Sequence, residues 1–121
     1  MSTIPRLKKR SDFLRVAAYQ RKVVMPTMIV QLAERSLVDK IGQDLPILRI
    51  GFTASRKVGN AVKRNFARRR LRVVVESVCP SFSFRGNDIV VIARSSILTA
   101  PFAALLRDFH QALTRLELPT S

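Results

Sequence analysis

LRIGFTASRKVGNAVKRNFARRRLR, residues 48–72, is the stretch that decides the fold of this chain. In its first part, residues 48–54 alternate between the two sides of an extended chain, which predicts a strand with one buried face. The other face, which is expected to meet water, carries Arg49, Gly51 and Thr53. From residue 60 to residue 78 the apolar residues recur every three or four positions, which predicts a helix with one core-facing side. A strand therefore leads through a short loop into a long helix.

The remaining sequence predicts further elements on both sides of this unit. A short helix is expected to open at Ser11, its predicted N-cap, and an amphipathic helix is expected at residues 101–116. Two more strands are expected at residues 27–34 and 88–94, and a polar loop at residues 35–44. The order is helix, strand, strand, helix, strand, helix, with room for one more strand. It predicts an α+β sandwich with the helices on one face of the sheet.

Length and composition limit the class of protein. The chain has 121 residues, which fits a single domain spanning residues 1–121. Its one cysteine, Cys79, excludes an internal disulfide and a cysteine-based zinc site. No apolar run reaches the length of a signal peptide core or a membrane span. We therefore expect a soluble, cytoplasmic protein.

The charge of the chain is concentrated rather than spread. There are 22 Lys and Arg residues against 8 Asp and Glu, which gives a net charge of +14. Residues 1–22 carry +6 and residues 52–75 carry +8, whereas the other segments balance. A surface that only keeps a protein in solution mixes charges of both signs. The two basic segments therefore predict a negatively charged partner.

The helix predicted at residues 60–78 presents its cations in register. Arg64, Arg68 and Arg72 fall four residues apart on one side, with Asn65 and Arg69 beside them. Guanidinium groups pair bidentately with phosphate oxygens, and no acid is interleaved to make this a solvated face of mixed charge. Nucleic acid is the predicted partner. Gly59-Asn60 before the helix is compatible with a phosphate-binding loop or with an ordinary turn.

The sequence offers no catalytic constellation. His110 is the only histidine and lies among apolar residues, which favours a structural role. Asp12, Glu76 and Asp88 are far apart and lack metal-ligand spacing. A protein nuclease needs a carboxylate cluster or an acid–base pair. We expect neither a catalytic residue nor a protein-bound metal or cofactor in this chain.

The quoted stretch resembles the signature of the bacterial ribonuclease P protein subunit, and weaker likeness extends over nearly the whole chain. The resemblance implies a two-layer sandwich of a four-stranded mixed sheet and three helices, with a left-handed βαβ crossover through the basic helix. It implies that the chain assists a large catalytic RNA in removing the 5′ leader of precursor tRNA. Magnesium ions held by that RNA would activate the water. Neither a membrane nor a protein partner is implied.

The resemblance also implies two sets of binding residues. The basic helix and the loop before it would contact the catalytic RNA through Arg56, Lys57, Asn60, Lys63, Arg64, Asn65, Arg68, Arg69 and Arg72. A cleft for the single-stranded leader would be lined or bordered by Phe13, Gln31, Thr53, Ser55, Lys57 and Arg94.

This chain departs from the family pattern at two positions. Phe66 stands where a further basic residue is common, and Ala17 where a second aromatic residue is common. Phe13 is compatible with stacking on RNA or with packing in the core. Two other classes of protein stay as alternatives. A structural RNA-binding protein of the ribosomal kind explains the charge but not the ordered signature. A stand-alone nuclease is disfavoured, because the chain lacks the acid–base residues that it needs.

Overall fold

The computed structural model describes residues 4–35 and 47–121. The elements in chain order are α1 (Arg10–Ala18), β1 (Arg21–Val24), β2 (Met28–Glu34), β3 (Leu48–Thr53), α3 (Ala61–Val78), the 3-10 helix η1 (Cys79–Ser81), β4 (Asn87–Ala93), the 3-10 helix η2 (Ser95–Leu98) and α4 (Phe102–Arg115). The predicted strands and the two long helices are confirmed with small shifts at their ends. The additional strand is β1, which begins at the end of the basic N-terminal segment. The loop predicted at residues 35–44 lies, apart from Arg35, outside the described residues.

The strands form one mixed sheet in the order β1-β2-β4-β3. The pairs β1–β2 and β2–β4 are antiparallel, and β3–β4 is parallel. Helix α3 connects the parallel pair, which is the βαβ unit expected from the sequence. Its left-handed sense stays a prediction. The outer edge of β3 is covered by the N-terminal segment, because Leu7 N donates to Ile50 O and Ile50 N donates to Pro5 O, each at 2.9 Å.

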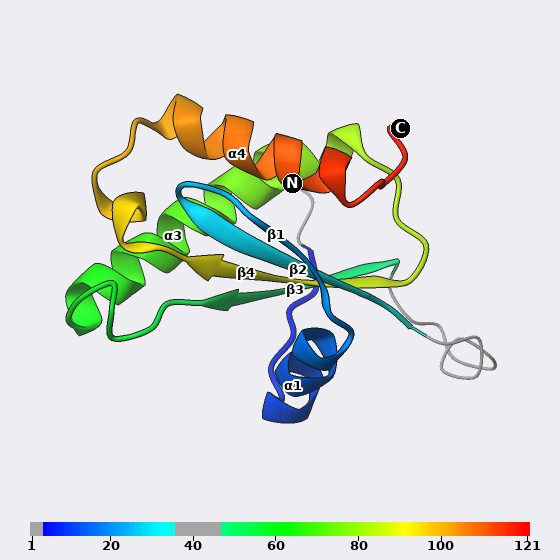
Figure 1. The fold of residues 1–121 in the computed structure, drawn as a ribbon, viewed down its shortest axis with the longest axis horizontal. Helices are drawn as coiled ribbons and strands as arrows, with labels where there is room; N and C mark the ends of the chain where they lie inside the picture. Colours follow the sequence, from blue (N-terminus) through cyan, green and yellow to red (C-terminus); the bar gives the residue numbers. More distant parts are fainter. Residues whose placement is uncertain (1–3, 36–46) are drawn as a thin grey trace.

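The helices lie on both faces of the sheet (Figure 1). Helices α3 and α4 cover one face and enclose the larger core, which includes Met28, Leu71 and Phe109. Helix α1 lies on the opposite face over a small cluster of Leu7, Val16, Ala33 and Val90. The prediction of helices on one face is therefore wrong for α1. The second face is apolar enough to need a cover, and one short helix supplies part of it.

The start of α1 also differs from the prediction. The helix begins at Arg10, and Lys9 occupies the N-cap position without a side-chain capping bond. Its first turn closes on the Lys9 carbonyl, which accepts from Asp12 N at 3.0 Å. Ser11 is thus an exposed residue of the first turn, not the N-cap. After the helix, Gln20 adopts φ 62° and reverses the chain into β1.

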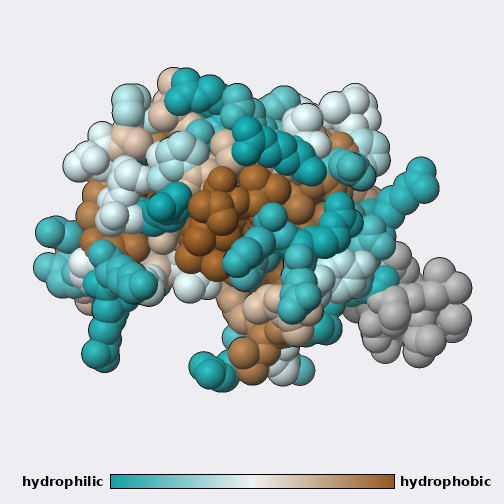
Figure 2. Space-filling model, viewed as in Figure 1, coloured by the Kyte–Doolittle hydropathy of each residue, from teal (hydrophilic) through white to brown (hydrophobic). Residues whose placement is uncertain are grey.

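Apolar surface remains visible at the middle of the view, over β1 and β2, with hydrophilic residues around it (Figure 2). Strand β1 is an edge strand, and its residue Val24 is 51% exposed.

Candidate nucleic-acid interface

Helix α3 begins at a glycine–asparagine turn that its geometry requires. Gly59 has φ +145°, a backbone conformation that strains a residue with a side chain, and a Cβ there would stand 2.6 Å from Lys63 Cδ, which would have to move. Asn60 is the N-cap, and its Oδ1 accepts a hydrogen bond from Lys63 N at 3.0 Å. The pair therefore serves the helix start. Contact of this turn with a phosphate stays a prediction.

One side of α3 forms an arginine stripe made of Arg64, Asn65, Arg68, Arg69 and Arg72. The neighbouring side of the helix packs on the sheet through residues such as Ala67 and Leu71, which are fully buried. Asn65 Oδ1 accepts from Arg68 Nη2 at 2.7 Å and so orients that guanidinium. Among residues 4–35 and 47–121, every ion pair involves an arginine outside α3. The stripe is thus left with its charge unneutralised there.

A hollow beside the stripe extends the basic surface across to β3. We call it the basic hollow; it is lined by Arg6, Phe52, Asn65, Arg68, Arg69 and Arg72. The Arg6 guanidinium carbon stands 5.2 Å from the centre of the Phe52 ring, which is a cation–π distance. Arg6 was not among the predicted site residues. Its only signal in the sequence is its place in the first basic segment.

The other cations of residues 56–72 differ in their surroundings. Arg56 and Lys57 lie exposed in the turn before α3, where Lys57 N donates to Ser55 Oγ at 3.3 Å. Lys63 is exposed in the first turn of α3. Arg70 instead points toward η2 and the residues just before α4, where it donates to Ile97 O at 2.6 Å and to Ala100 O at 2.9 Å. One of the eight cations is therefore structural.

A second surface lies on the sheet face that α1 covers only in part. The strand register places two rows of side chains there, one formed by Lys22, Gln31, Val90 and Gly51 and the next by Val24, Ile29, Ile92 and Thr53. Gln31, Ile29, Ile92 and Thr53 are all partly exposed. We call these rows, with the side of α1 that faces them, the α1-side face. It brings together Phe13, Gln31 and Thr53, which the sequence placed in one site.

Phe13 packs against this face and keeps part of its ring in solvent. A Cβ on Gly51 would stand 2.6 Å from Phe13 Cε1, so the ring lies directly on the glycine. The side chain belongs to the small cluster under α1, yet it is only partly buried. At Gly51 the face is therefore covered rather than wet, contrary to the prediction, whereas Arg49 and Thr53 stay partly exposed. Phe13 has a packing role, and stacking on RNA stays a prediction.

The remaining predicted residues border this face at one end. Strands β3 and β4 run in parallel and end together at Thr53 and Ala93. Ser55, Lys57 and Arg94 follow these ends, and all three are exposed. Arg94 Nη1 donates to Met25 O at 2.8 Å, which fixes it beside the β1–β2 hairpin. Cations thus stand where the partly apolar rows open to solvent.

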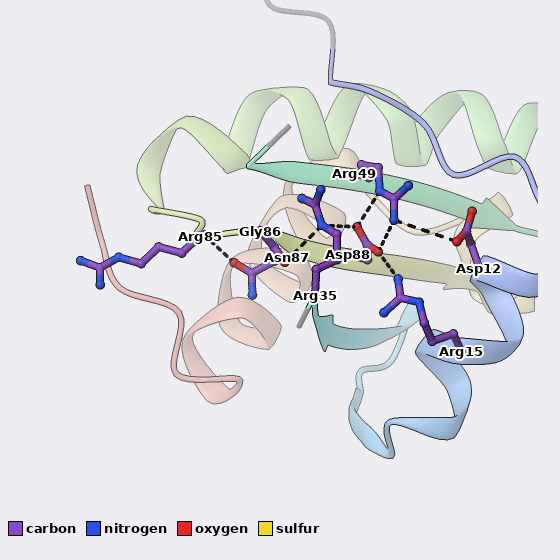
Figure 3. A network of polar contacts seen from close by, with 8 residues as sticks. All are labelled: Asp12, Arg15, Arg35, Arg49, Arg85, Gly86, Asn87 and Asp88. Atoms are coloured by element: carbon purple, nitrogen blue, oxygen red, sulfur yellow. Dashed lines mark hydrogen bonds and ion pairs between the residues drawn. The ribbon is translucent and has the colours of Figure 1, made fainter. Parts of the chain in front are cut away.

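A buried carboxylate holds α1 onto the sheet (Figure 3). Asp88, in β4, is fully buried and accepts from Arg49 Nε at 2.9 Å and Arg49 Nη2 at 2.7 Å. It also accepts from Arg15 of α1, and Arg35 Nε stands 3.4 Å from Asp88 Oδ1. Asp12 of α1 pairs with the same Arg49 at 4.0 Å. In the sequence these are two distant acids, whereas the fold joins them through arginine.

The surroundings of His110 and Cys79 indicate structural roles for both residues. The exposed His110 ring meets Phe82 edge to face, with centroids 5.0 Å apart. Burial raises the pKa of the Cys79 thiol to about 12, so it is a poor nucleophile. Within the described ranges, no three His, Cys, Asp or Glu residues are grouped so as to hold a metal ion. No described helix has the length and apolar character to cross a membrane.

Comparison with known proteins gives matches over almost the full chain. The family model described as Ribonuclease P matches residues 1–117. A ribonuclease P protein component from Paramagnetospirillum magneticum is 51% identical over 114 residues, which cover 93% of this chain and 82% of the relative. One from Ruegeria pomeroyi is 44% identical over 119 residues, which cover 98% and 90%.

Solved structures give the same fold. The RNase P protein from Staphylococcus aureus matches with a TM-score of 0.75 and 23% identity, covering 96% of this chain and 98% of that one. The protein from Thermotoga maritima matches with a TM-score of 0.72 and 24% identity, covering 91% and 96%. These two likenesses show the α+β fold with its mixed four-stranded sheet.

Proposed function

The chain belongs to the bacterial ribonuclease P protein family, and from this premise we propose how its two surfaces divide the binding of RNA. It is a protein subunit of ribonuclease P, a ribonucleoprotein endoribonuclease of tRNA processing, and its partner is the ribonuclease P RNA. In our proposal the arginine stripe and the basic hollow bind that catalytic RNA. The α1-side face binds the single-stranded 5′ leader of precursor tRNA.

The unneutralised arginine stripe is the observation that carries the proposal. Four guanidiniums on one side of a rigid helix match phosphate oxygens bidentately. Since each phosphate contact releases about one counterion, such a surface binds RNA with an affinity that falls steeply with salt. Arg6 adds a further cation at the edge of β3. The predicted contacts of Arg56, Lys57, Asn60 and Lys63 extend the same surface toward the start of α3.

The α1-side face suits a strand of variable sequence. Ile29 and Ile92 give it a partly exposed apolar floor, and Phe13 offers part of a ring at its border. Every base has a face that stacks on such groups, at about 1–3 kcal/mol per base. Lys57 and Arg94 at its open end attract phosphates without regard to sequence. Gln31, Thr53 and Ser55 supply polar groups between them.

The chemistry of hydrolysis is proposed to lie in the RNA, with the magnesium ions bound there. The protein then acts by contributing cations at the places where catalytic RNA and leader approach each other. Its excess of 22 basic over 8 acidic residues suits that role. We place this work in the cytoplasm, where precursor tRNA is processed in bacteria.

Reconstitution tests the catalytic-RNA surface. The chain is added to ribonuclease P RNA and precursor tRNA at low magnesium, and cleavage should require both components. Arg64→Ala and Arg68→Ala should each flatten the dependence of log affinity on log salt by roughly one unit. Arg107→Ala is the matched control, because it removes one exposed arginine from α4 instead. Equal effects from Arg68 and Arg107 would contradict the assignment, and RNA binding without any rate effect would favour a purely structural RNA-binding protein.

Substrate preference tests the α1-side face. Phe13→Ala and Gln31→Ala should leave catalytic-RNA affinity unchanged and weaken capture of leader-bearing precursor relative to mature tRNA. Leu14→Ala is the control, since Leu14 is the neighbour of Phe13 on α1 and is 56% exposed. Equal losses for precursor and mature tRNA would count against a leader site on this face.

A further inference from the structure

An apolar niche lies on the other flank of the arginine stripe, between α3 and the start of α4. It is lined by Phe66, Arg69, Arg70, Val73 and Phe102 and has a volume of about 160 Å³. Phe66, Val73 and Phe102 are 41%, 47% and 38% exposed, so three large apolar side chains meet solvent together. The volume is roughly ten times that needed by one water molecule. Three exposed apolar side chains that meet at one hollow, with two arginines at its rim, make this the apolar surface to consider as a contact site.

The niche is held in a fixed shape by a partly buried arginine that is bound to backbone carbonyls. Arg70 is bound by the Ile97 and Ala100 carbonyls, at 2.6 and 2.9 Å. Its guanidinium carbon stands 5.7 Å from the centre of the Phe66 ring. One side of the ring is thereby supported by a planar cation that is anchored to another element. The exposed part of Phe66 is a preorganised platform rather than a loose side chain.

We propose that this niche takes one unpaired nucleobase of the catalytic RNA, stacked on Phe66. The inference rests on the proposed binding of that RNA to the arginine stripe. Arg69 connects the two, because it lines both the basic hollow and the niche. A strand whose phosphate is held by Arg69 therefore has a base within reach of Phe66. An aromatic face accepts any base, which suits a niche whose accessible lining is apolar.

Charge decides against the other occupants of an apolar niche. No carboxylate lines it, and α3 carries no acid from Ala61 to Val75. A second copy of this chain would bring two arginine stripes together, each on a chain of net charge +14. An RNA strand instead supplies the anions for the rim and a flat apolar group for the niche.

The test uses the full chain and the ribonuclease P RNA of the same organism. Phe66→Ala should weaken binding of this RNA by between about fivefold and 150-fold, the range that loss of one stacked base gives. The slope of log affinity against log salt should stay unchanged, because no phosphate contact is lost. Phe66→Leu fills the niche without a ring and should also weaken binding, whereas Phe66→Tyr should not. Val62→Ala is the control on the same side of α3, since Val62 is 76% exposed and lies outside the niche.

A photo-cross-linking residue at position 66 provides the second measurement. It should attach to one unpaired nucleotide of the RNA. The inference is overturned if Phe66→Ala binds like the unmodified chain, if its salt slope flattens, or if cross-links join two protein copies instead. Arg68→Ala separates this result from failure of the proposed function: a weakened Arg68→Ala with an unaffected Phe66→Ala removes only the nucleobase niche. If neither variant alters RNA binding, the proposed function fails as well.

Discussion

Replacing Asp88 by Asn should be among the most destabilising single changes in this protein. The carboxylate is fully buried and is shared by Arg15, Arg35 and Arg49, so these four groups carry a net charge of +2. Asn keeps the shape and removes the charge, which raises the net charge to +3. Breaking a buried ion pair by removing one partner costs about 3–5 kcal/mol. The free energy of unfolding of natural domains is roughly 5–15 kcal/mol, so about a fifth or more of the stability is at stake.

Urea unfolding followed by far-UV circular dichroism measures this loss. The midpoint should fall at constant slope, and the melting temperature should drop by roughly 10–20 °C. Asp12→Asn is the matched control, because Asp12 is partly exposed and 4.0 Å from Arg49, a pair worth less than about 1 kcal/mol. The reasoning is refuted if Asp88→Asn loses no more than Asp12→Asn. At a temperature where Asp88→Asn is still folded, its preference for leader-bearing precursor over mature tRNA should fall more than its affinity for the catalytic RNA. The reason is that Arg15 ties α1 to this carboxylate.

Three further changes have expected outcomes. Gly51→Ala should displace the Phe13 ring, because the added Cβ would stand 2.6 Å from it. We expect the free energy of unfolding in urea to fall by about 1–3 kcal/mol and the preference for leader-bearing precursor to weaken. Gly59→Ala should cost about 1–3 kcal/mol, since φ +145° strains a side chain that also meets Lys63; unchanged stability would contradict the need for glycine. Cys79 should resist alkylation at pH 8 until the chain is unfolded. Burial raises the pKa of its thiol to about 12, so the unfolded chain loses this proton first and the free energy of unfolding should fall as the pH rises from 9 toward 12. A Cys79→Ala variant should lack that part of the loss of stability at alkaline pH.

Local patterns predicted most of the fold because they are set by burial of one side of each element. Alternation in residues 48–54 and the apolar side of residues 60–78 correspond to β3 and α3. Strand β1 was not located, since RKVV is short and reads first as part of a basic run. The side on which α1 packs depends on a glycine and a carboxylate in distant strands, Gly51 and Asp88. No local pattern carries that information.

The same distinction applies to the candidate site. The arginine stripe follows from helical spacing alone, so the sequence is enough to name its members. Arg6 joins them only because residues 5–7 pair with the edge of β3. Arg70, which was not among the predicted contacts, is instead bound to backbone carbonyls 27 and 30 positions further along the chain. Long-range contacts thus added one cation, Arg6, to the predicted surface.

Strand β3 touches both proposed RNA sites through adjacent residues. Phe52 lines the basic hollow, and Thr53 lies in a row of the opposite face. Neighbouring side chains of a strand point to opposite sides of one backbone. The two proposed RNA sites are therefore held apart by the thickness of one strand, and their separation is set by the backbone of β3 rather than by side-chain motion.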